Sequence, residues 1–220
     1  MAILTTISKY VDIAGPLLGI LLCLYWNKGK QKAGGYLIVI SYLLLQLIAN
    51  SIAKYMSIHR INNITVYKFN ALLSLLIVSV WFYHEFKQRL SSKKLYLLAI
   101  YMIGIHCLSG MIIYFEDTTG LNSLSLSFTA FNACLFCGIF YITSLTKLND
   151  SNLFQSTQFW ITTAFFLYYS TCFCIYVSFK IITKKSGGNF MYLWIIQNYF
   201  LFISCCILGF SFKNIKKWSM

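Results

Sequence analysis

Seven long apolar stretches, separated by short polar connectors, constrain the fold of this chain more than any other feature. A helix needs about 20 predominantly apolar residues to cross a bilayer, within a range of about 17–25. The stretches cover residues of about 10–26, 34–54, 65–86, 95–115, 125–146, 158–180 and 190–212. Only 10% of the residues are charged, against about 25% in a soluble domain, so a water-facing surface could not be covered. We predict an all-α, polytopic membrane helix bundle with seven transmembrane helices.

The connectors between these stretches are short, which predicts that helices adjacent in sequence pack antiparallel. We expect residues 1–220 to form a single transmembrane domain. The first stretch lacks the basic start of a signal peptide, and no small-x-small cleavage site follows Trp26 before the basic connector. It therefore does not read as a cleaved signal.

Lys and Arg residues in the connectors predict the orientation, because cytoplasmic loops carry an excess of them. With the N-terminus outside and the C-terminus inside, eleven of these residues lie in inner regions and six in outer ones. The connector with Glu116 and Asp117 is then also an outer one. The basic residues, which give a net charge of +13, occur as short clusters that suit anionic lipid headgroups. We expect the lipid bilayer as a partner and no nucleic acid.

The eight cysteines all fall inside apolar stretches, where a free thiol packs as a small hydrophobe. Cys134-x-x-Cys137 has the spacing of half a zinc or redox motif, but no second ligand pair accompanies it. We read the cysteines as packing residues and predict no metal site, no cofactor and no disulfide framework.

Polar side chains inside the apolar stretches are candidate site residues, because an uncompensated polar group in lipid is costly. The candidates are Asp12, Gln46, Asn50, Lys68, Asn70, His106, Ser109, Asn132, Ser170, Thr171, Gln197 and Asn198. Under the predicted orientation most of them lie towards the outside. From this one-sided depth we predict a polar ligand-binding cavity in the outer half, formed by Asp12, Asn50, Lys68, Asn70, His106, Asn132 and Asn198. The alternative is that these side chains only join helices through hydrogen bonds.

Lys68 leaves two alternatives open. Its ammonium group needs a counter-charge or a water path inside the membrane, and Asp12 is its only nearby carboxylate by depth. Otherwise Lys68, which lies a few residues from a helix start, extends its side chain to the headgroups. Trp160, Tyr192 and Trp194 lie near predicted helix ends, where such rings anchor helices in the headgroup region.

Asn62 and Asn63 precede the third stretch and suit a turn and an N-cap. Asn63-Ile64-Thr65 also matches a glycosylation acceptor, but its closeness to the membrane favours the cap. Two Asn residues ahead of an aromatic-rich third span, in a seven-span chain of this size, resemble a group of uncharacterised small membrane proteins found widely in Bacteroidota. The resemblance implies a multi-pass bacterial inner-membrane protein and carries over no activity and no catalytic residue.

Several chemistries lack the residues that they need. The last stretch has no Lys for a retinal Schiff base, and Cys107-Leu108-Ser109-Gly110 lacks the first Gly of the rhomboid-protease motif. The depths of His84 and His106 differ by roughly 12 Å at about 1.5 Å per residue, which does not suit one haem. Glu85 beside His84 suits acid–base chemistry or, as the favoured reading, a solvated helix end.

These observations lead to one leading hypothesis and two alternatives. The leading one is a non-enzymatic receptor or sensor component that binds a small or lipid-like ligand in the outer-half cavity. It would signal through a partner protein at the inner loops. The alternatives are a small transporter or channel, and an intramembrane enzyme acting on a lipid-like substrate with His106 or Glu85 as the acid–base group.

Overall fold

The computed structural model describes residues 10–27, 35–116, 124–145, 154, 156–185 and 191–213. In this part of the chain it contains seven α-helices and no strand. The helices are α2 (Val11–Trp26), α3 (Tyr36–Ile58), α4 (Ile64–Lys87), α5 (Ser92–Phe115), α6 (Leu124–Leu145), α7 (Thr157–Lys185) and α8 (Met191–Phe210). The predicted all-α class is therefore confirmed.

Six of these helices, α3 to α8, are long and apolar enough to cross a membrane. Helix α2 is shorter, with 16 residues, which is about 24 Å against a hydrocarbon core of about 30 Å. The helical, apolar bundle is consistent with a multi-pass integral membrane protein. Seven spans and an outer N-terminus remain predictions.

The outward faces of the helices are apolar. Leu21, Ile48, Leu76, Ile103 and Ile142 are all about half exposed or more, and each belongs to a different helix. A surface of this kind is costly in water but suits lipid tails, which are as apolar as the side chains.

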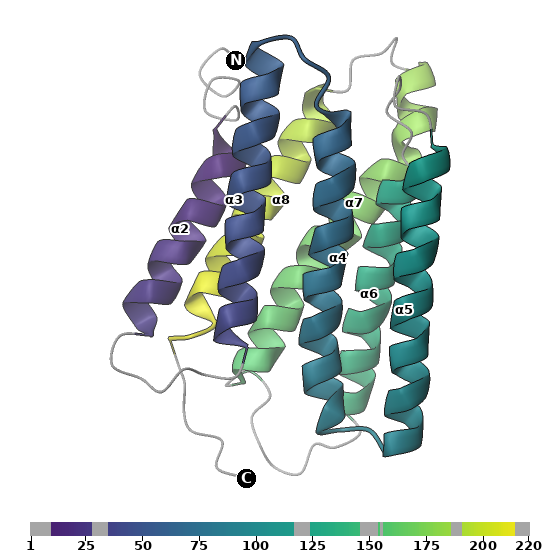
Figure 1. Ribbon diagram of the computed structural model, residues 1–220. Coiled ribbons are helices and arrows are strands. Elements are labelled where there is room, and N and C mark those ends of the chain that lie inside the picture. The colour runs from purple at the N-terminus through teal and green to yellow at the C-terminus, as the bar shows by residue number, and fades with distance from the viewer. Residues whose placement is uncertain are drawn as a thin grey trace.

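Six helices form a closed ring, and α5 lies outside it. Around the ring, α2 packs against α3, α3 against α4, α4 against α6, α6 against α7, α7 against α8, and α8 against α2. Helix α5 packs on the outer side of this ring against α4 and α6. Successive helices alternate in direction (Figure 1). We call the end where α2 begins and α3 ends the upper end, as it is drawn in Figure 1, and the opposite end the lower end.

Glycines close the ring between α2 and α8. A Cβ atom on Gly15 would lie 2.8 Å from the Phe202 Cα, and one on Gly19 would lie 2.8 Å from the Cys205 carbonyl oxygen. On α8, a Cβ on Gly209 would lie 2.6 Å from the Leu22 Cβ of α2. Gly15 and Gly19 form a small-xxx-small pair, which lets two helix backbones approach closely in a membrane.

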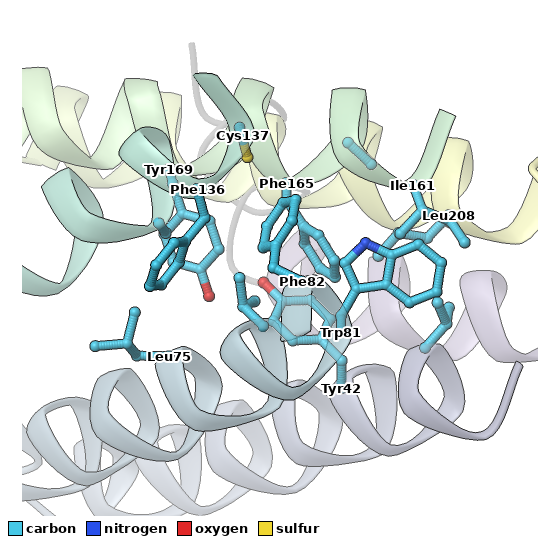
Figure 2. Packing of buried hydrophobic residues seen from close by; sticks show 14 of the residues in the cluster. Tyr42, Leu75, Trp81, Phe82, Phe136, Cys137, Ile161, Phe165, Tyr169 and Leu208 are labelled. Atoms are coloured by element: carbon cyan, nitrogen blue, oxygen red, sulfur yellow. The ribbon is translucent and has the colours of Figure 1, made fainter. Parts of the chain in front are cut away.

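Aromatic side chains fill the lower half of the ring. Trp81, Phe82 and Phe86 of α4 and Phe136 and Phe140 of α6 are almost fully buried there. From the neighbouring helices, Tyr42 and Phe165 meet edge to face with their ring centroids 5.0 Å apart. Figure 2 shows these rings facing one another between the helices. We call this group, together with Ile161, Leu208 and Phe212, the aromatic plug.

Gly35 allows the start of α3 to pack closely against the aromatic plug. It is the residue before α3 and has a φ of +88°, a left-handed conformation that glycine adopts without strain. A Cβ on Gly35 would overlap the Trp81 indole ring. Both the backbone conformation and the close contact therefore require glycine at this position.

Helix α3 continues to Ile58, beyond the predicted end near 54, because a defined stop follows only there. Arg60 has a φ of 58°. Its N–H donates to the Ser57 carbonyl, and the Ile61 N–H donates to the Met56 carbonyl over 2.8 Å. This is the Schellman arrangement that satisfies the last carbonyls of a helix. The turn then leads to α4, where the Asn62 side chain accepts a hydrogen bond from the Ile64 N–H over 3.0 Å.

Candidate functional site

A cavity lies on the ring axis in the upper half, above the aromatic plug. Its volume is about 40 Å³, which is room for a few water molecules, and it is open on one side. It is lined by Gln46, Asn50, Tyr67, Asn70, Ala71, Ser74, Leu126, Thr129, Ala130, Tyr168, Tyr169, Cys172, Tyr176, Trp194, Gln197, Asn198 and Leu201. These residues come from α3, α4, α6, α7 and α8.

The wall formed by α3 and α4 carries a network of side-chain amides. The Asn70 Nδ2 donates to the Gln46 Oε1 over 3.1 Å, and the Gln46 Nε2 donates to the Ser74 Oγ over 2.7 Å. The Ser74 hydroxyl in turn donates to the Asn70 Oδ1 over 3.3 Å. These mutual bonds hold each side chain in one orientation, so this wall is preorganised.

The opposite wall, formed by α7 and α8, has an unsatisfied polar atom. The Gln197 Nε2 donates to the Tyr176 hydroxyl over 2.6 Å. The Gln197 Oε1 is buried and has no hydrogen-bond partner among the described residues. A buried amide oxygen without a partner costs about 1–3 kcal/mol, so an occupant of the cavity that donates a hydrogen bond would be stabilising.

Two aromatic residues meet across the upper rim of the cavity. Tyr67 in the first turn of α4 and Trp194 in the first turn of α8 pack edge to face, with ring centroids 5.1 Å apart. Helices α4 and α8 are not neighbours in the ring, so this pair spans the cavity. Trp194, predicted as a membrane anchor, is thus a lining residue of the cavity.

Three of the seven predicted site residues line this cavity: Asn50, Asn70 and Asn198. Asp12 contributes its backbone, since its carbonyl oxygen accepts a hydrogen bond from the Asn50 Nδ2 over 2.9 Å. The side chains of Asp12, Lys68, His106 and Asn132 are not among the lining residues. Whether any of these residues binds a ligand stays a prediction.

The structure gives Lys68 a partner that differs from both predicted alternatives. Its Nζ lies 3.2 Å from the Glu116 Oε2, and the two side chains are only 2% and 6% exposed. It also donates to the Glu116 carbonyl oxygen over 3.4 Å. Glu116 directly follows the upper end of α5, next to the start of α4, and this closeness could not be seen from depth within the spans alone.

The Glu116 carboxylate also caps α6. Its Oε1 accepts hydrogen bonds from the backbone N–H groups of Leu124, over 3.1 Å, and Ser125, over 3.4 Å. The Ser125 hydroxyl donates to its Oε2. A negative charge at a helix N-terminus is favourable because the first N–H groups point towards it. One carboxylate therefore connects α4, α5 and α6.

Asn132 of α6 bonds to α5, and His106 lies on α5 itself. The Tyr101 hydroxyl donates to the Asn132 Oδ1 over 2.7 Å, and the His106 Nδ1 lies 2.6 Å from the Met102 carbonyl oxygen. Because α5 lies outside the ring, its polar residues at cavity depth are separated from the axis by α4 and α6. His106 was therefore assigned to the cavity by its depth alone, and Asn132 of α6 bonds to Tyr101 of α5 and is not a lining residue.

Several lining residues were not assigned to the site from the sequence. Gln46 and Gln197 were candidates, whereas Ser74, Tyr168 and Tyr176 were not considered. A signal for them exists in the spacing, because residues three and four apart share one face of a helix. On α4 the lining positions are 67, 70, 71 and 74, and on α8 they are 194, 197, 198 and 201.

A second polar cluster lies at the lower end. Glu85 is buried, although a solvated helix end was the favoured expectation for it. Its Oε1 lies 3.6 Å from the His84 Nδ1, and its Oε2 lies 3.9 Å from the Arg89 Nη2. The Arg89 guanidinium lies over the Phe140 ring at 4.4 Å and donates to the Ser144 hydroxyl. Burial lowers the pKa of Arg89, and the Glu85 charge opposes this shift.

In the described residues, no group of three or more His, Cys, Asp or Glu side chains is arranged to hold a metal ion. No protein-family model matches the chain, and no curated protein and no solved structure matches it.

Proposed function

We propose that this chain is a multi-pass protein of the bacterial inner membrane, with an outer N-terminus, that binds a small ligand in the cavity of its outer half. In this orientation the upper end faces outwards. The chain acts as a receptor or sensor component and passes the signal to a partner protein at its inner connectors. The observation that carries the proposal is a cavity with a preorganised amide wall on one side and an unsatisfied amide oxygen on the other.

The aromatic plug favours ligand binding over the passage of a solute through the bundle. Directly below the cavity, Trp81, Phe82, Phe136, Phe140 and Phe165 fill the ring axis with almost fully buried rings. A channel needs a polar path that continues to the other side. The packed rings weigh against that alternative.

Two helices connect the cavity to the lower end. Helix α4 carries Asn70 and Ser74 at the cavity and Glu85 in the lower polar cluster. Helix α8 carries Gln197 at the cavity and Leu208 in the plug. A ligand that bonds to both walls would change the spacing of α4 and α8, and the plug and the cluster would transmit that change to the inner connectors.

The proposal is tested by the compounds that the protein retains. The full chain is purified in lipid nanodiscs and denatured, and the released small molecules are identified by mass spectrometry. Ala130→Leu places a larger side chain in the cavity lining. Ala99→Leu is the matched control, because it makes the same change on α5, outside the ring.

We expect at least one compound that the wild type and Ala99→Leu retain and that Ala130→Leu loses. Thermal unfolding of both variants checks that they are folded. If all three proteins retain the same compounds at the same level, the cavity binds no ligand from the cell and the proposal is wrong.

A further inference from the structure

The residues that line the cavity carry no formal charge. They are amides, hydroxyls, aromatic rings, aliphatic side chains and one thiol. The nearby ammonium of Lys68 is already paired with Glu116 at 3.2 Å. A charged ligand would therefore lose its water without meeting a counter-charge, which is unfavourable in a buried site.

The lining also favours a flat ligand. Tyr67 and Trp194 form the upper rim, and Tyr168 and Tyr176 come from α7. Aromatic side chains pack well against planar rings in offset or edge-to-face geometry. The same ring faces attract cations, so the charge of the ligand has to be tested at constant planarity.

The unsatisfied Gln197 Oε1 specifies the polar edge of the ligand. Gln197 is only 7% exposed, and it lines the cavity. Its Nε2 is used by the Tyr176 hydroxyl, so its oxygen is the atom left to accept a bond. The ligand therefore needs an N–H or O–H group that reaches this oxygen.

We propose that the cavity selects an uncharged, planar molecule with an N–H or O–H donor that bonds to the Gln197 Oε1. Primary carboxamides on an aromatic ring and neutral heterocycles with a ring N–H belong to this class. The inference rests on the proposed function, because it names the chemistry of the ligand in the same cavity.

Three planar probes of nearly the same shape test the charge: neutral benzamide, cationic benzamidinium and anionic benzoate. A fourth, N,N-dimethylbenzamide, keeps the ring and the carbonyl but has no N–H donor. Binding of each probe to the full chain in nanodiscs is measured by ligand-observed NMR titration. The variants are Gln197→Leu and, as a control, Gln88→Leu, at an exposed position of the lower end.

We expect benzamide to bind the wild type about tenfold more tightly than N,N-dimethylbenzamide, which is the effect of one buried hydrogen bond. It should also bind more tightly than the two charged probes, because these lose their hydration without meeting a counter-charge. Gln197→Leu should weaken benzamide binding by about the same factor and leave N,N-dimethylbenzamide unchanged. Gln88→Leu should leave all four affinities unchanged.

Preferred binding of benzamidinium or benzoate by the wild type would overturn the neutral class and leave ligand binding intact. Equal loss of benzamide and N,N-dimethylbenzamide in Gln197→Leu would overturn the role of the N–H donor. If no probe binds although the cell supplies a retained compound, the proposed class is wrong and the proposed function stands. If no probe binds and no compound is retained, the cavity holds water only and both fail.

Discussion

Lys68 and Glu116 form a buried ion pair, with the ammonium nitrogen 3.2 Å from a carboxylate oxygen. The two residues are separated by 48 positions in the chain and meet where α4 begins and α5 has just ended. Because the same carboxylate accepts the first N–H groups of α6, this pair ties the outlying helix α5 to the ring. It also neutralises the only cation that lies within the apolar stretch of α4 near the cavity.

Removing one member of this pair should be strongly destabilising. Lys68→Met leaves the Glu116 carboxylate buried without its counter-charge, and breaking a buried pair in this way costs about 3–5 kcal/mol. We expect a clear drop in the thermal unfolding temperature of Lys68→Met in detergent. The double variant Lys68→Met/Glu116→Gln should recover part of that drop, because no charge is then left unpaired. Equal unfolding temperatures of Lys68→Met and the wild type would contradict the buried pair.

Gly35→Ala should destabilise the chain by disturbing both α3 and the plug. The Cβ would overlap the Trp81 ring, and the left-handed φ of +88° would become strained. The strain alone is worth about 1–2 kcal/mol. Gly104→Ala is the matched control, because a Cβ there meets no atom within 4 Å. It should be neutral or stabilising, as for glycine in a helix interior. Equal unfolding temperatures of the two variants would rule out the Gly35–Trp81 contact.

Gly19→Ile should separate α2 from α8. Even a single carbon at Gly19 would lie 2.8 Å from the Cys205 carbonyl oxygen, so the two backbones have to move apart. We expect reduced stability and, in a variant with cysteines placed on facing positions of α2 and α8, slower disulfide cross-linking. Gly110→Ile makes the same change where the built Cβ meets no atom within 4 Å. Cross-linking between α2 and α8 should proceed in that variant as in the wild type.

Trp194→Ala should open the upper rim of the cavity. It removes one ring of the Tyr67–Trp194 pair, while Cys172 lies in the cavity lining and is buried. The rate at which a small neutral reagent such as methyl methanethiosulfonate modifies Cys172, followed by peptide mass spectrometry, should rise severalfold. Cys137, buried in the core, serves as the internal control and should react at an unchanged rate. A parallel rise at Cys137 would indicate general loosening instead of an opened rim.

Hydropathy was sufficient to predict the helical class, because spans of this length leave few alternatives in lipid. It was less informative about helix ends. The predicted span stopped near 54 because Lys54 lowers the hydropathy, whereas α3 continues to Ile58 and ends at a hydrogen-bonded turn around Arg60. Hydropathy measures preference for lipid and contains no information about the backbone geometry that stops a helix.

Depth along a helix could be read from the sequence, but the direction in which a side chain points could not. Asn70 and His106 were assigned to one site because they lie at similar depth. Asn70 lines the cavity, whereas His106 belongs to a helix outside the ring. Which helix lies outside the ring depends on the contacts among all seven described helices. No local sequence pattern in α5 indicates that it is this helix. The partner of Lys68 was missed for a related reason, because depth gave Asp12 as the only nearby carboxylate, whereas Glu116 reaches Lys68 from a connector.

The contact between α2 and α8 also sets an order of events during biosynthesis. These are the first and the last helices of the described chain, and the ring closes only where they meet. A nascent chain that has inserted six helices still lacks Trp194, Gln197 and Asn198, and Gly15 and Gly19 still face lipid. The cavity is therefore completed only when α8 has been synthesised and has packed against α7 and α2.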